Sequence, residues 1–136
     1  MKALYIKIAG IINLITAIIH VIGGQVDLVN PLLDSNMTGQ AKGELVSVWH
    51  MVTILLFLTS YIIIKVGFGK GKPLDLNLLK AIGVLYVLMG LPFIISSLWY
   101  GIFAPQWILL MPIGILILIG IKKMLKGQFP DYFKSN

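Results

Sequence analysis

Four long apolar stretches, separated by short polar segments, dominate the pattern of this chain. They cover about residues 3–29, 45–66, 76–100 and 106–125. An α-helix that crosses the hydrocarbon core of a bilayer needs about 20 mostly apolar residues. The pattern therefore predicts one all-α domain, an integral membrane four-helix bundle with four transmembrane spans.

The polar segments carry signals for helix ends and loops. The Gly- and Lys-rich segment 67–73 is typical of a solvated loop. Asn30–Pro31 predicts the end of the first helix, because proline disfavours a helical conformation in the residue before it. Residues 34–43 predict a polar loop, so the second helix is expected to begin near Glu44.

The lysines predict the orientation of the bundle. The net charge of +6 comes from eleven basic residues, all of them lysine, against five acidic ones. Membrane proteins keep an excess of basic residues in their cytoplasmic loops. We therefore expect a multi-pass protein of the cell membrane with both termini and the second loop in the cytoplasm. The lysines on that side are Lys2, Lys7, Lys65, Lys70, Lys72, Lys80, Lys122, Lys123, Lys126 and Lys134; Lys42 alone lies in the first loop.

Composition excludes several classes of function. A chain without cysteine has no disulfide, no thiolate metal site and no cysteine nucleophile. It also lacks arginine, the side chain that holds phosphates in a bidentate manner. Because the lysines lie at the ends of apolar stretches, we expect their positive charge to interact with the lipid bilayer and not with a nucleic acid.

Two sets of small residues recur every seven positions, which returns almost to the same face of a helix. Small residues let membrane helices approach closely, so these sets predict packing seams. The last helix has almost no polar side chain between Trp107 and Ile121, and is predicted to be the most lipid-exposed helix or a contact in a homo-oligomer. The seams are Gly10, Ala17 and Gly24 in the first helix, and Gly83, Gly90 and Ser97 in the third.

Two histidines and two acids occupy matching positions in the first two helices. His20 precedes Asp27 by seven residues, and His50 follows Glu44 by six. Since these helices run in opposite directions, each histidine should lie about 9–10 Å deeper than its acid. We predict an outward-facing pocket with both imidazoles at one level and both carboxylates nearer the outer surface. The further residues expected to line it are Asn13, Gly24, Ser47, Trp49, Ser96 and Tyr100.

Three functions fit such a pocket. His20 and His50 can ligate a divalent metal or a b-type haem, or one of them can hydrogen-bond a small apolar or quinone-like ligand. A histidine that titrates near neutrality also suits an ion- or proton-coupled transporter, which would act as an oligomer. In the third alternative, the protein is a non-catalytic accessory or scaffolding subunit that pairs with a membrane partner. Ser47 lies near His50 without a nucleophile elbow, so no catalytic residue is assigned and enzymatic activity stays open.

Overall fold

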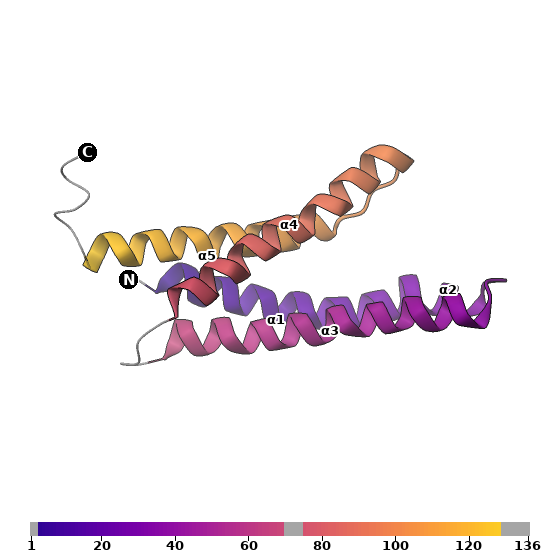
Figure 1. Cartoon of the computed structure of the whole chain (residues 1–136), viewed down its shortest axis with the longest axis horizontal. Helices are drawn as coiled ribbons and strands as arrows, with labels where there is room; N and C mark the ends of the chain where they lie inside the picture. Colours follow the sequence, from indigo (N-terminus) through magenta and orange to yellow (C-terminus); the bar gives the residue numbers. More distant parts are fainter. Residues whose placement is uncertain (1–2, 70–74, 129–136) are drawn as a thin grey trace.

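The computed structural model describes residues 3–69 and 75–128, and the side chains of this part up to residue 126. Lys2, Lys70, Lys72 and Lys134 lie outside the described residues. The described part is entirely helical (Figure 1). Its elements are α1 (Leu4–Gly24), a π-helical turn η1 (Gln25–Val29), α2 (Asn30–Asp34), α3 (Gly39–Phe68), α4 (Leu76–Tyr100) and α5 (Gln106–Gln128).

Four of the helical segments are long and apolar enough to cross a membrane. The first is continuous through α1, η1 and α2, Leu4–Asp34, and has 31 residues; α3 has 30 and α4 has 25. In α5 the candidate span is Gln106–Lys126, with 21 residues. The prediction of four apolar helices is therefore confirmed.

The expected helix end at Asn30–Pro31 is wrong, because the chain stays helical to Asp34. In η1 the amide of Asn30 donates to the carbonyl of Gln25, five residues earlier. Pro31 follows directly after this turn, and because its ring carries no N–H it leaves one carbonyl of the preceding turn without a backbone donor. A π-helical turn thus carries the helix past a residue that usually stops one.

The second helix also begins earlier than expected, at Gly39. Thr38 is its N-cap, and the Thr38 hydroxyl accepts a hydrogen bond of 3.3 Å from the amide of Ala41. A threonine cap satisfies one of the amides that a helix start leaves free. The loop between the first two helices is therefore shorter than the polar pattern predicts.

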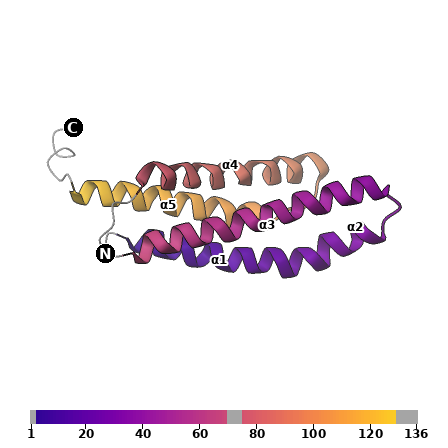
Figure 2. The ribbon, with the colours of Figure 1, turned by 60° about the horizontal axis from the view of Figure 1, so that its bottom comes forward.

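The helices form two antiparallel hairpins, α1–α3 and α4–α5, and the small-residue seams lie inside them (Figure 2). A Cβ added to Gly10 would lie 2.9 Å from the Ile64 side chain in α3. One added to Gly83 would lie 3.1 Å from Leu118 in α5. The predicted seams in the first and third helices are thus confirmed as packing faces.

The last helix packs against two others and its span is as buried as that of the first helix, so the prediction that it is the most lipid-exposed is wrong. It packs so closely against α4 that a Cβ added to Gly114 would lie only 2.5 Å from the Gly83 carbonyl oxygen. It also packs against α1, where Gly120 faces Ile6. Ile113 and Ile117 are fully buried between these neighbours. An apolar surface suits lipid and helix contacts equally, and here the glycines decide for helix contacts.

The two hairpins lie close together at one end of the molecule and separate at the other. We call the end near Leu4 and Gln128 the terminal end, and the end with the loops 35–38 and 101–105 the far end. In Figure 1 the far end of α4 lies well away from the α1–α3 hairpin. In Figures 1 and 2 the α1–α3 hairpin also extends beyond the tip of α4–α5. The interior is consequently best packed in the terminal half.

Candidate functional site

Three helices meet at a buried polar centre, which consists of Asn13, Thr59 and Tyr86. The Asn13 amide Nδ2 donates to Thr59 Oγ1 at 3.1 Å, and also contacts the Leu56 carbonyl at 3.4 Å. Thr59 Oγ1 lies 2.6 Å from the Tyr86 hydroxyl. Asn13 and Tyr86 are fully buried, and Thr59 nearly so. The polar centre therefore joins α1, α3 and α4 near the middle of all three.

One buried acceptor of the polar centre has no hydrogen-bond donor. Thr59 Oγ1 lies 2.7 Å from the Leu55 carbonyl and accepts from Asn13, while in its contact with Tyr86 either hydroxyl can donate. Asn13 Oδ1 is buried and has no hydrogen-bond partner in the structure. Buried polar atoms without a partner are rare, since each loses its water without compensation. The centre is thus short of a hydrogen-bond donor.

One heptad from the level of the polar centre toward the far end, the corresponding positions of the four long helices carry mainly aromatic side chains. His20, Trp49, Phe93 and Trp107 lie one heptad from the buried Asn13, Leu56, Tyr86 and Gly114, respectively. We call these four residues the aromatic layer. Every member of it is half-buried, whereas all four counterparts are buried. Since a heptad keeps the face of a helix, these rings point toward the interior where the hairpins separate.

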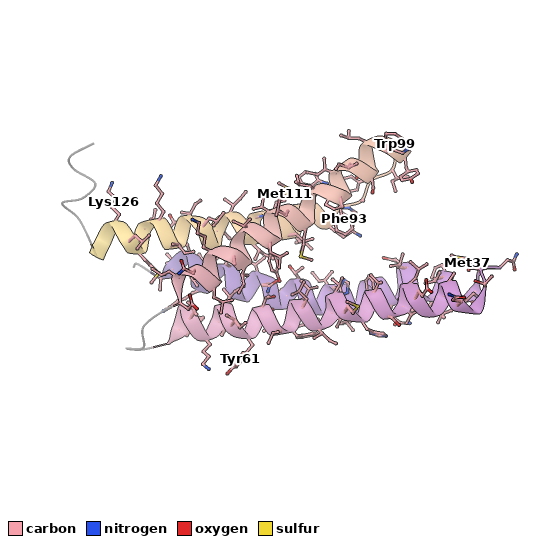
Figure 3. The ribbon with its side chains drawn as sticks, viewed as in Figure 1. Met37, Tyr61, Phe93, Trp99, Met111 and Lys126 are labelled. Carbon is pink, nitrogen blue, oxygen red and sulfur yellow. The ribbon has the colours of Figure 1, made fainter. Side chains whose placement is uncertain are left out.

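The two hairpins contribute equally to the aromatic layer. Phe93 lies on the side of α4 that faces the α1–α3 hairpin, while Trp99 lies at the far tip (Figure 3). A Cβ on Gly90 of α4 would lie 3.6 Å from the Trp107 Cβ, so Trp107 is held against α4. Each hairpin therefore supplies two of the four rings, and Phe93 is turned toward the other hairpin (Figure 3).

His20 and Trp49 form the best-defined pair of the layer. Their rings stack with centroids 3.7 Å apart and an interplanar angle of 15°. His20 Nε2 lies 3.5 Å from the Trp49 carbonyl, at the limit of a hydrogen bond. The Trp49 indole also covers Gly24, where any Cβ would overlap the ring. Glycine at position 24 is what allows the tryptophan to reach the histidine.

Other residues of the predicted pocket lie apart from this layer. His50 is exposed, one residue and about 100° around α3 from Trp49. Asp27 is exposed in η1, and Glu44 accepts a hydrogen bond from Gln40. The Ser47 hydroxyl donates to the Gly43 carbonyl. Of the remaining two, Ser96 is half-buried and Tyr100 is exposed. The structure thus brings together His20, Gly24 and Trp49, with Asn13 one heptad deeper.

The metal hypothesis combines His20 and His50 with the carboxylates of Asp27 and Glu44, and the haem hypothesis uses the two histidines. Within residues 3–69 and 75–128, no group of three His, Cys, Asp or Glu side chains is placed to hold a metal ion. One face of the His20 ring is covered by Trp49. A metal or haem would therefore have to draw its remaining ligands from elsewhere, and this function stays a prediction.

A separate apolar depression of about 440 Å³ lies on the outer side of α4 and shares no residue with the polar centre or the aromatic layer. Its lining comes from one helix, which makes it a shallow surface groove. The lining residues are Asn77, Lys80, Ala81, Val84, Leu85 and Leu88.

Sequence reasoning missed Thr59, Tyr86, Phe93 and Trp107 as parts of the site. A signal for Tyr86 was present, because a phenol in the middle of an apolar helix needs a hydrogen-bond partner. The heptad relation between Tyr86 and Phe93 could then have found the aromatic layer. Comparison offers no further guide: no protein family, no curated protein and no solved structure matches the chain.

Proposed function

We propose that this chain is an integral membrane protein that binds a flat, largely apolar small molecule, such as a quinone-like ring, between its two hairpins. One observation carries the proposal. The side chains of the aromatic layer are half-buried, whereas the residues one heptad nearer the terminal end on the same helices are buried. Ligand sites are commonly lined by apolar and aromatic side chains with a few placed polar groups. The aromatic layer supplies the walls, and His20 supplies a polar group.

The chemistry of His20 fits a ligand with an oxygen at its edge. A neutral imidazole has one donor nitrogen and one acceptor nitrogen. Its contact with the Trp49 carbonyl is long, at 3.5 Å, so a ligand that offers a shorter hydrogen bond can replace it. Stacking on Trp49 meanwhile holds the ring plane in place.

The chain offers a matched pair of histidines for a test of this site. We expect His20→Ala to weaken binding of a decyl-substituted benzoquinone about tenfold, the effect of one lost hydrogen bond of about 1.4 kcal/mol. His50→Ala should leave binding unchanged, because His50 is exposed beside the layer. Quenching of tryptophan fluorescence by the quinone in detergent or nanodiscs gives both affinities, with Trp49 and Trp107 as reporters.

Other outcomes of the same test point to other functions. Loss of binding in both variants, with a Soret band or a bound metal in the purified protein, would favour the bis-histidine centre instead. Equal quinone binding in wild type and both variants would remove His20 from the site. No saturable binding at all would sink the ligand hypothesis and leave transport or scaffolding.

We also propose that the terminal end is cytoplasmic. Lys7, Lys65, Lys80, Lys122, Lys123 and Lys126 all lie at that end of their helices, whereas Lys42 lies near the far end. Two of these lysines lie over aromatic rings from neighbouring helices, Lys7 over Phe68 at 4.9 Å and Lys123 over Tyr5 at 4.2 Å. Lysines and tyrosines of this kind anchor membrane helices at the interface, and lysine marks the cytoplasmic side.

The absence of native cysteine makes the orientation directly testable. In intact cells, an impermeant maleimide should label Asn36→Cys in the loop at the far end and leave Lys126→Cys unlabelled. Both positions are exposed, so permeabilised cells should show labelling of both. The reverse pattern in intact cells would invert the proposed topology without affecting the ligand site.

A further inference from the structure

The polar centre lies directly below the aromatic layer and lacks a donor. Asn13 and His20 share one face of α1 and are seven residues apart, about 10 Å along the helix axis. Tyr86 and Phe93 stand in the same relation on α4. A ring held in the aromatic layer therefore has the polar centre at its inner edge.

The polar centre has one buried acceptor, Asn13 Oδ1, that lacks a hydrogen. The Asn13 amide hydrogens go to Thr59 and the Leu56 carbonyl, and the Thr59 hydroxyl has its own acceptors in the Leu55 and Leu56 carbonyls. Thr59 and Tyr86 share a further hydrogen bond in which either hydroxyl can donate, and Asn13 Oδ1 is left without a donor. Only a hydroxyl or an amine brings the missing hydrogen. A carbonyl or an ether at this place would add another acceptor.

We infer that the ligand carries a hydroxyl on its inner edge, which donates a hydrogen bond to Asn13 Oδ1. This inference rests on the proposed function and narrows its substrate class to phenols and quinols, in preference to quinones and ethers. A phenol ring fills the aromatic layer while its hydroxyl points toward the polar centre. The discrimination comes from the buried acceptor, since a site built to hydrogen-bond a hydroxyl rejects analogues that lack it.

A matched pair of probes isolates this hydrogen bond. 4-Propylphenol and 4-propylanisole share the ring and the alkyl chain, but only the phenol can donate. With the full chain in nanodiscs, we expect the phenol to bind about tenfold more tightly than the anisole. Asn13→Leu should bring the phenol down to the affinity of the anisole and leave anisole binding unchanged. Competition with quinone quenching of tryptophan fluorescence gives all four affinities.

The outcomes separate this inference from the proposed function. If both probes bind equally to the wild-type chain and His20→Ala weakens both, the layer binds ligands but the donor preference is wrong. If neither probe binds, the proposed function itself fails. Should Asn13→Leu fold poorly, the comparison of the two probes on the wild-type chain still decides whether a donor is preferred. Tyr86→Phe then offers a variant of the polar centre that retains Asn13. Retained phenol preference in well-folded Asn13→Leu would overturn the role of Asn13.

Discussion

Alanine in place of Gly114 is expected to destabilise the protein by about 3 kcal/mol, toward the upper end of the range for overpacked interiors. The added Cβ would lie 2.5 Å from the Gly83 carbonyl oxygen and 2.9 Å from the Val87 amide nitrogen. Both are backbone atoms of α4, so no side-chain rotation relieves the clash. The whole of α4 has to move away from α5, and the packing of Gly83 on Leu118 is weakened with it.

A denaturation series in detergent measures this effect, with Gly43→Ala as the matched control. Gly43 is also helical, but a Cβ there meets nothing within 4 Å. The control should be neutral or more stable by up to about 1 kcal/mol, since alanine is the better helix former. Equal stability of Gly114→Ala and Gly43→Ala would mean that α4 and α5 do not pack as described.

Gly24→Ala is expected to dismantle the aromatic layer. Its Cβ would occupy the place of the Trp49 indole, so the indole has to leave and the stack on His20 is lost. We expect quinone binding to fall by more than tenfold, because the ligand loses a wall as well as the oriented imidazole. The destabilisation should be about 1–3 kcal/mol, smaller than for Gly114 if the side chain finds another rotamer.

The neighbouring glycine provides the control for this change. A Cβ on Gly23 meets nothing within 4 Å, so Gly23→Ala should keep both binding and the tryptophan emission of wild type. The Gly24 variant should instead show a shifted emission and a weaker near-ultraviolet circular dichroism signal. If quinone affinity is equal in the two variants, then Trp49 is no part of the binding site.

The sequence was a good guide to the helices and to the faces that pack. Apolar length alone locates four spans, because a bilayer sets a minimum length for a helix. The spacing of Gly10, Gly24, Gly83 and Gly90 locates the helix contacts, since only small residues allow such close approach. Both signals are local in the chain, and for this reason they can be read without coordinates.

The site was harder to predict because it depends on side-chain direction across helices. Equal depth suggested that His20 and His50 meet, but adjacent residues on a helix differ by about 100°. The ring that stacks on His20 is that of Trp49, which precedes His50 in the chain. Asn13 bonds to Thr59, 46 positions away, and Thr59 bonds to Tyr86, 27 positions further on, so no local pattern specifies this centre. The position of α5 was missed because lipid and protein are equally good solvents for an apolar helix.

The unequal length of the hairpins gives the proposed ligand site a rim of unequal height. At 1.5 Å per residue, α1–α2 and α3 are about 45 Å long, whereas α4 and α5 are about 36 Å. With the terminal ends level, the loop at residues 35–38 therefore stands about 9 Å above the α4–α5 tip. The proposed topology predicts that molecules dissolved in the outer leaflet reach the site over the α4–α5 tip, past Trp99. It also predicts that limited proteolysis of intact cells cuts the protruding loop at residues 35–38.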